Sequence, residues 1–297
     1  MKIAIASGKG GTGKTTIATS LASCLALLHP TWYLDCDVEA PNGHIFLKPE
    51  LTQEAEAVIR IPKIQVNACT LCRTCVQVCQ LNALAQVGKT IMVFPQLCHG
   101  CGSCTWNCPE GAITEVPNPI GLLQAGITPE GIYFLRGLLT ISEPMPTPII
   151  RQLKRWQSPP PDAVLIHDAP PGASCSVVET LRGVDFVLLV TEPTPFGIHD
   201  LKQMTGIIAE MKIPAGVVIN RENGEYRPLL ELCKDSDLPV LMEVPYDRLI
   251  AEGLAKGKKL IEIDGQYKHQ LLKVFERIQD ICHKESNRLE KFGENSR

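Results

Sequence analysis

The stretch Gly8-Lys9-Gly10-Gly11-Thr12-Gly13-Lys14-Thr15 decides the fold of this chain. It follows a short apolar run, residues 2–6, and opens a segment, residues 14–28, whose leucines and isoleucines recur at helical spacing. A glycine loop between a buried strand and a helix matches G-x-x-x-x-G-K-[ST], the loop whose backbone N–H groups close around phosphates. The sequence therefore predicts a strand, a phosphate-binding loop and a helix, in that order.

Each polar side chain of this loop has an expected contact. Lys14 should reach the β- and γ-phosphates of a nucleotide, Thr15 should ligate Mg²⁺, and Thr16 should reach the α-phosphate. The helix N-terminus adds partial positive charge, which makes a glycine turn that binds nothing a poor alternative. The expected phosphate-binding residues are Gly8, Lys9, Gly10, Gly11, Thr12, Gly13, Lys14, Thr15 and Thr16.

Apolar runs alternate with helical segments along most of the chain. A second strand is expected to end at Asp35, and four further runs occupy residues 163–166, 186–190, 216–219 and 240–242. Alternation of apolar strands and helices predicts an α/β fold with a doubly wound parallel sheet. Such sheets bind ligands at the carboxyl ends of their strands.

Eight of the 13 cysteines lie between residues 60 and 117. They form two runs with the C-x₂-C-x₂-C-x₃-C spacing of bacterial ferredoxins, in which the fourth cysteine of each run binds the cluster of the other run. Zinc sites instead pair two C-x₂-C units. We therefore expect two [4Fe–4S] clusters, one on Cys69, Cys72, Cys75 and Cys108, the other on Cys98, Cys101, Cys104 and Cys79.

The alternation of strands and helices breaks in this cysteine-rich stretch. We expect residues 61–117 to form an inserted ferredoxin-like α+β domain, with residues 1–60 and 118–297 as the discontinuous host domain. Pro117-Asn118-Pro119 is interpreted as the exit linker. Trp106, between two cluster cysteines, is expected to pack against the domain.

The phosphate loop contains a second lysine, Lys9, and here the chain resembles the deviant Walker A ATPases, which include MinD, ParA, Mrp and the nitrogenase iron protein. In that family this lysine crosses the interface of a nucleotide-sandwich dimer and contacts the partner's ATP. The resemblance therefore implies an ATP-dependent homodimer, or a heterodimer with a paralogue. The alternative is a solvated loop lysine.

The resemblance covers roughly residues 1–60 and 118–260 and implies further site residues. Asp35-Cys36-Asp37 resembles switch I, with Asp37 as the carboxylate that positions water. The stretch 167–172 resembles switch II, in which Asp168 would hold Mg²⁺ through water and the Gly172 amide would sense the γ-phosphate. With Lys9 and Lys14, the two aspartates form the expected catalytic set.

Two weaker matches concern the nucleotide base. Asn220 and Arg221 follow an apolar run and resemble the adenine-reading segment, although an asparagine that caps a strand end is an alternative. Residues 244–247, with Pro245 and Asp247, resemble the loop that closes over the base.

These features predict an ATPase that couples nucleotide-dependent dimerisation to low-potential electron transfer, with a protein electron donor or acceptor as partner. The cysteine-rich stretch follows switch I directly, which favours such coupling. The alternative is an iron–sulfur cluster or metallocofactor carrier, although the host lacks the Cys-x-x-Cys of Mrp-like carriers. A spatial organiser of the MinD or ParA kind is disfavoured, because the apolar last segment, residues 271–281, has mixed charge and is expected to pack in the core.

Composition excludes several other classes. A net charge of −3 and 5% aromatic residues favour neither nucleic acid nor an anionic membrane as partner. The start of the chain has no basic leader, and no run of about 18 apolar residues occurs. We therefore expect a cytoplasmic protein without a stable membrane anchor.

Overall fold

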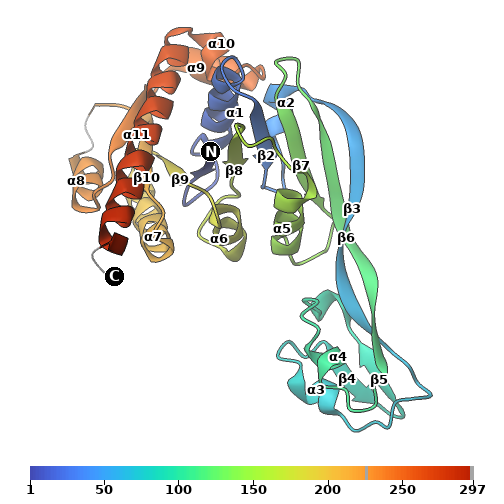
Figure 1. Cartoon of the computed structure of the whole chain (residues 1–297). Helices are drawn as coiled ribbons and strands as arrows, with labels where there is room; N and C mark the ends of the chain where they lie inside the picture. Colours follow the sequence, from blue (N-terminus) through green and yellow to red (C-terminus); the bar gives the residue numbers. More distant parts are fainter. Residues whose placement is uncertain (225–226, 295–297) are drawn as a thin grey trace.

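The computed structural model describes residues 1–224 and 227–294. Within them, nine strands form one sheet in the order β11-β10-β9-β1-β8-β2-β7-β6-β3, and helices cover both faces (Figure 1). Only β6 runs against the other strands. The strands are β1 (Lys2–Ala6), β2 (Thr31–Asp35), β3 (Glu50–Ile64), β6 (Ile113–Ile127), β7 (Tyr133–Leu139), β8 (Val164–Asp168), β9 (Phe186–Thr191), β10 (Ala215–Glu222) and β11 (Val240–Pro245).

Strand β1 shows why both faces of the sheet are apolar. Successive side chains of a strand point to opposite faces, so Ile3 and Ile5 enter one core cluster while Ala4 and Ala6 enter the other. The first face is covered by α1 (Lys14–Leu25), α2 (Gly43–Leu47), α9 (Arg248–Ala255), α10 (Leu260–Ile263) and α11 (Gln266–Glu294). The second is covered by α5 (Thr147–Trp156), α6 (Cys175–Leu181), α7 (Pro195–Met211) and α8 (Arg227–Asp235).

The doubly wound parallel sheet predicted from the apolar runs is confirmed, and all five expected later runs are strands of it. Helix α11 packs the expected apolar positions, among them Leu271 and Phe275, into the core. The prediction missed β7, β6 and β3, which are the last three strands at one end of the sheet. In the described part of the chain, no helix is both long and apolar enough to cross a membrane.

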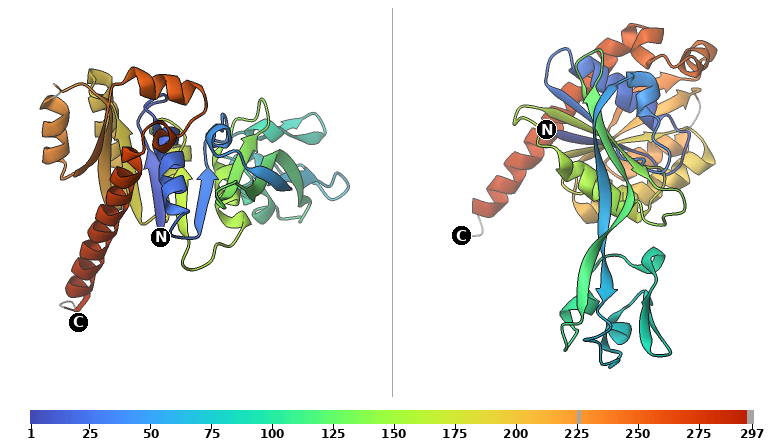
Figure 2. Two further views of the ribbon diagram at one scale, coloured as in Figure 1. Left: turned by 90° about the horizontal axis from the view of Figure 1, so that it is seen from above. Right: turned by 90° about the vertical axis from the view of Figure 1, so that its right-hand side faces the viewer.

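Strands β3 and β6 form a ribbon that leaves the edge of the sheet. Each has 15 residues, and their pairing runs from Glu50 opposite Ile127 to Ile64 opposite Ile113. Only the stretch 121–127 of β6 also pairs with β7. The remainder of the ribbon projects past the carboxyl end of β7 and carries residues 65–112 at its tip (Figures 1 and 2).

The unit at the tip has a small core of its own. It contains the hairpin β4 (Leu84–Val87) and β5 (Thr90–Val93), and two short helices, α3 (Thr74–Val78) and α4 (Ser103–Trp106). The two cysteine runs fold alike, since each helix follows a residue with positive φ and buries the third cysteine of its run. Trp106 was expected to pack, but it is 90% exposed at the end of α4.

Both expected boundaries of the insertion fall inside continuous strands. Residues 60–61 lie in β3 and residues 117–118 lie in β6. The interpretation of Pro117-Asn118-Pro119 as a linker is wrong, because these residues pair with residues 58–60 of β3. Prolines are tolerated there because no third strand needs their missing N–H groups, and the register shifts beside Val58.

Because the ribbon separates the two parts, we predict that the part containing the main sheet folds without the tip. Replacing residues 65–112 by Asn-Gly, which favours a two-residue hairpin turn, should leave a closed ribbon and an intact main sheet, because the tip has a separate core. Thermal unfolding by circular dichroism and nucleotide binding by calorimetry should both stay close to the full chain. Aggregation or loss of nucleotide binding would show that the tip supports the host.

Candidate functional site

A cavity of about 540 Å³ lies at the carboxyl ends of β2, β10 and β11, beside the loop after β1. This is within the usual size of ligand pockets, ~300–1,000 Å³. Ten of the residues predicted from the sequence line it: Gly10, Gly11, Gly13, Lys14, Thr15, Thr16, Asp37, Asn220, Arg221 and Asp247. Gly8 and Thr12 instead line a small space between the loop and α7, and Lys9, Asp168, Gly172 and Pro245 line neither.

The loop needs glycine at position 13 for two reasons. Gly13 has φ 96°, a left-handed conformation that costs other residues energy, and a Cβ there would lie 2.4 Å from Nδ2 of Asn220. That amide donates a hydrogen bond to the Thr12 carbonyl at 2.8 Å. Asn220, which we expected to read the base, therefore supports the phosphate loop through this bond while also lining the cavity.

Lys14 begins α1 and is almost completely buried. Its Nζ donates to the Lys9 carbonyl at 3.4 Å. Burial lowers the pKa of Lys14, and the nearby charges of Asp168 and Asp37 oppose that change. The loop thus places one ammonium group between two carboxylates where the phosphates of a nucleotide would arrive.

The carboxylate of Asp168 ends β8 and is 1% exposed. Its Oδ2 accepts a hydrogen bond from the hydroxyl of Tyr33 at 2.7 Å. Burial raises the pKa of Asp168 to about 6, while Thr15, Tyr33 and the charge of Lys14 act in the opposite direction. Oδ1 of Asp168 is buried and has no hydrogen-bond partner among the described residues.

Asp35 is a site residue to which the sequence analysis gave no role. It is fully buried at the end of β2, and its carboxylate accepts hydrogen bonds from the backbone N–H groups of Asp37 at 3.3 Å and Gly43 at 2.9 Å. Burial raises its pKa, and the charge of Asp168 adds to the effect. Asp35 thereby holds both ends of the segment that runs from the cavity to α2.

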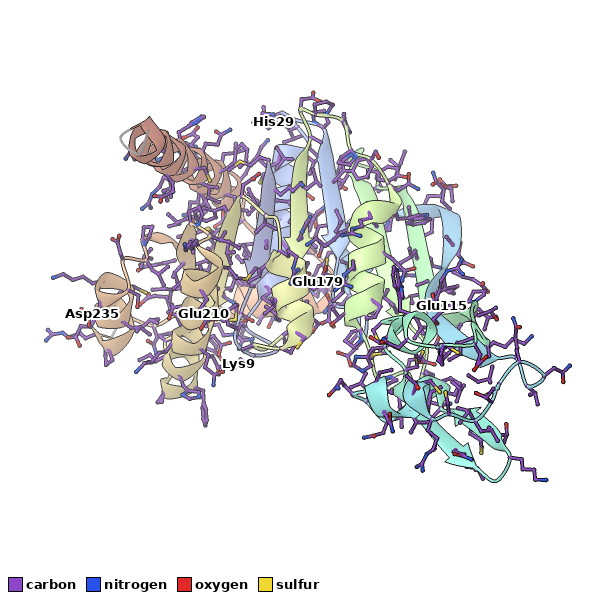
Figure 3. All side chains as sticks on the ribbon, turned by 60° about the horizontal axis from the view of Figure 1, so that its bottom comes forward. Lys9, His29, Glu115, Glu179, Glu210 and Asp235 are labelled. Atoms are coloured by element: carbon purple, nitrogen blue, oxygen red, sulfur yellow. The ribbon has the colours of Figure 1, made fainter. Side chains whose placement is uncertain are left out.

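Glu192 is a second residue that the sequence analysis missed. Its Oε2 lies 3.2 Å from Nζ of Lys9, its Oε1 pairs with Arg221, and its side chain is only 8% exposed. Figure 3 shows Lys9 on the main body, away from Glu115 in the ribbon. The available signal was the position of Glu192 two residues after the apolar run 186–190, because strand ends face the site.

The eight cysteines of the tip line two separate cavities. One is lined by Cys69, Cys72, Cys75 and Cys108, the other by Cys79, Cys98, Cys101 and Cys104. Each cavity thus combines three cysteines of one run with the fourth of the other. Over residues 1–224 and 227–294, no three histidine, cysteine or carboxylate side chains surround a point suited to a single metal ion.

The donors in both cavities fit [4Fe–4S] clusters, in which four cysteine thiolates hold several iron atoms rather than one. Backbone N–H groups already point at the sulfurs. Ala83 donates to Cys79 at 3.2 Å, and Ala112 donates to Cys108 at 3.3 Å, at the equivalent place in the second run. Hydrogen bonds of this kind stabilise thiolate charge and tune cluster potential.

A phosphate loop joining a strand to a helix at the carboxyl edge of a doubly wound sheet defines a P-loop nucleotide-binding protein. Residues 3–261 match the family model for the CobQ/CobB/MinD/ParA nucleotide binding domain, and the chain belongs to this family.

Three relatives come from Methanocaldococcus jannaschii. Uncharacterized protein MJ0579 is 30% identical over 263 residues, which cover 88% of this chain and 92% of the relative. Uncharacterized protein MJ0578 is 27% identical, with 95% and 97% covered. An iron-sulfur cluster carrier protein is 22% identical, with 93% and 83% covered.

Solved structures with the same fold include two archaeal MinD proteins. The septum site-determining protein MinD of Pyrococcus horikoshii, complexed with Mg-ADP, has a TM-score of 0.55 at 18% identity, with 93% of this chain and 95% of that chain covered. The cell division ATPase MinD of Pyrococcus furiosus has a TM-score of 0.56 at 16% identity, with 94% and 98% covered.

From the geometry of the loop we predict that alanine lowers the stability of the protein at Gly13 but not at Gly10. Gly13→Ala should lower the free energy of unfolding by at least about 1 kcal/mol, from the left-handed backbone alone, before the contact with Asn220 is counted. Gly10→Ala is the matched control, because its added Cβ would meet only the Cβ of Pro171, at 3.9 Å. Urea denaturation without nucleotide measures both, and equal stabilities would contradict the described loop.

Proposed function

We propose that the protein binds and hydrolyses Mg·ATP and couples nucleotide-dependent dimerisation to low-potential electron transfer through two [4Fe–4S] clusters. The observation that carries the proposal is the connection between the sites. The segment that lines the nucleotide cavity continues through α2 into β3, which ends at the cysteine-lined tip. One continuous stretch of backbone therefore joins the nucleotide cavity to the cysteine-lined tip.

In the nucleotide site, Lys14 would contact the β- and γ-phosphates, and Thr15 and Asp168 would hold Mg²⁺, the latter through water. Asp37 would orient the attacking water. The Gly172 N–H donates to the Ser7 carbonyl at 3.1 Å, so sensing the γ-phosphate would require exchange of this bond. Magnesium would supply charge stabilisation at the phosphates. Asn220, Arg221, Pro245 and Asp247 would surround the base.

Dimerisation would use Lys9, as the resemblance to deviant Walker A proteins implies. In the single chain Lys9 pairs with Glu192, and Arg221 shares this carboxylate. Release of Lys9 toward a partner's nucleotide would therefore leave the buried Glu192 still paired, which avoids the cost of an isolated buried charge. The partner would be a second copy or a paralogue.

In the tip, Cys69, Cys72, Cys75 and Cys108 would hold one cluster, and Cys98, Cys101, Cys104 and Cys79 the other. The clusters would supply one-electron transfer to or from a protein partner. The chain's own contribution is to place eight thiols in two cavities and to direct backbone N–H groups at the sulfurs.

A carrier of iron–sulfur clusters or another metallocofactor is the second candidate function. It is favoured by the 22% identical relative named an iron-sulfur cluster carrier protein. Complete sets of four cysteines favour resident clusters over a cluster in transit.

An anaerobic redox titration of the iron-loaded protein, followed by EPR, tests the coupling. Between nucleotide-free and Mg·ATP-bound protein we expect a shift of at least about 60 mV in one cluster, which is a tenfold effect for a one-electron couple. Mg·ADP serves as the comparison. Equal potentials in all three states would contradict gating of the clusters by nucleotide and favour the carrier.

A second test separates the two sites. Lys14→Ala should abolish Mg·ATP hydrolysis, because it removes the charge that contacts the transferred phosphate, while iron content and visible absorbance stay unchanged. Cys108→Ser is the reciprocal variant and should lower iron content but spare ATP binding. Loss of iron in the lysine variant would show that the sites do not fold independently.

A further inference from the structure

A buried hydrogen bond joins Tyr33, in the middle of β2, to Asp168 at the end of β8. The hydroxyl donates to Oδ2 at 2.7 Å, and the two residues are 0% and 1% exposed. The other oxygen, Oδ1, is buried and has no hydrogen-bond partner among the described residues. A buried carboxylate oxygen without a donor is unusual, and it indicates a place for a ligand or a water.

The ring of Tyr33 is tightly packed on both sides of its hydrogen bond to Asp168. Its ring stacks on Phe134 with centroids 5.6 Å apart and planes inclined by 9°, within the core under α1. Gly43 makes room for the hydroxyl, because a Cβ at that position would lie 2.6 Å from it. The direction in which Tyr33 presents its hydroxyl is therefore set by the core.

We propose that Tyr33 is a positioning residue for Mg²⁺: it holds Oδ2 of Asp168 and leaves Oδ1 for the water shell of the metal. This inference rests on the proposed nucleotide site. A carboxylate that can rotate must first be ordered before it binds the metal's water, and this ordering costs free energy. A hydrogen bond that already fixes the carboxylate avoids part of that cost. Tyr33 does not line the nucleotide cavity, so its effect on Mg²⁺ binding would pass through Asp168.

The test compares the affinity for ADP with Mg²⁺ and with EDTA, measured by calorimetry on the full chain. The ratio of the two affinities reports only what the metal adds. In Tyr33→Phe, which keeps the ring and removes one oxygen, this ratio should fall by ~10-fold, the effect of losing a hydrogen bond to a charged group. The affinity in EDTA should not change.

Tyr133→Phe is the matched control. Tyr133 packs against Trp32 with ring centroids 4.2 Å apart and planes inclined by 33°, on the strand next to that of Tyr33, and it does not line the cavity. Its variant should keep the wild-type ratio. Asp168→Asn should abolish most of the effect of Mg²⁺, and adding Tyr33→Phe to it should then change nothing, since the tyrosine acts through that carboxylate.

Three results would overturn the inference. They are an unchanged ratio in Tyr33→Phe, an equal loss of affinity with and without Mg²⁺, and a further loss when Tyr33→Phe is added to Asp168→Asn. If Tyr33→Phe is too unstable to measure, Gly43→Ala tests the same contact by crowding the hydroxyl, and the same fall in the ratio is expected. Wild-type protein that binds no ADP would instead contradict the proposed function and not this inference alone.

Discussion

The buried ammonium of Lys14 beside the carboxylates of Asp37 and Asp168 is the interaction on which the rest of the site depends. Charges are costly to bury unless they are paired, so the strands that end here must bring both signs to one point. Burial lowers the pKa of Lys14 and raises that of Asp168 to about 6, because both groups lose contact with water in the site. A magnesium ion and a triphosphate would add the missing charges of both signs. The phosphate loop, Asp35, Asn220 and Tyr33 all hold this arrangement in place through buried hydrogen bonds.

The ribbon of β3 and β6 places the tip, residues 65–112, away from the main sheet without a flexible linker. Its two strands pair along their whole length, so their backbone groups satisfy one another even where no third strand is present. A Gly/Ser-rich linker would be flexible, whereas a paired ribbon would pass a displacement at its base on to the tip. That base starts three residues after α2, whose first N–H is held by Asp35 at the nucleotide cavity. The tip is thus connected to a segment of the host that lines the cavity at Asp37, Ala40, Asn42 and Phe46.

In the proposed dimer, Lys9 would have a different partner from the one it has in the single chain. In the single chain it pairs with Glu192, a nearly buried carboxylate that also binds Arg221. Because two cations share this carboxylate, one of them can leave while the buried carboxylate stays paired with the other. The pairing would therefore be compatible with the proposed release of Lys9 toward a partner.

The sequence by itself determined the phosphate loop, the parallel α/β class and the spacing of the cysteine runs, because each depends on residues that are close together in the chain and on local periodicity. The conformation of the phosphate loop follows from Gly13 and its neighbours, and buried parallel strands can be recognised in the sequence as apolar runs. Only the tertiary structure decided that residues 113–127 continue as a strand, since their alternating and proline-containing pattern becomes a strand only through pairing with β3. It also decided the partners of Tyr33 and Asn220, which bind groups 135 and 208 residues away. Contacts at such separations depend on which strands become neighbours in the sheet, and no local pattern records that order.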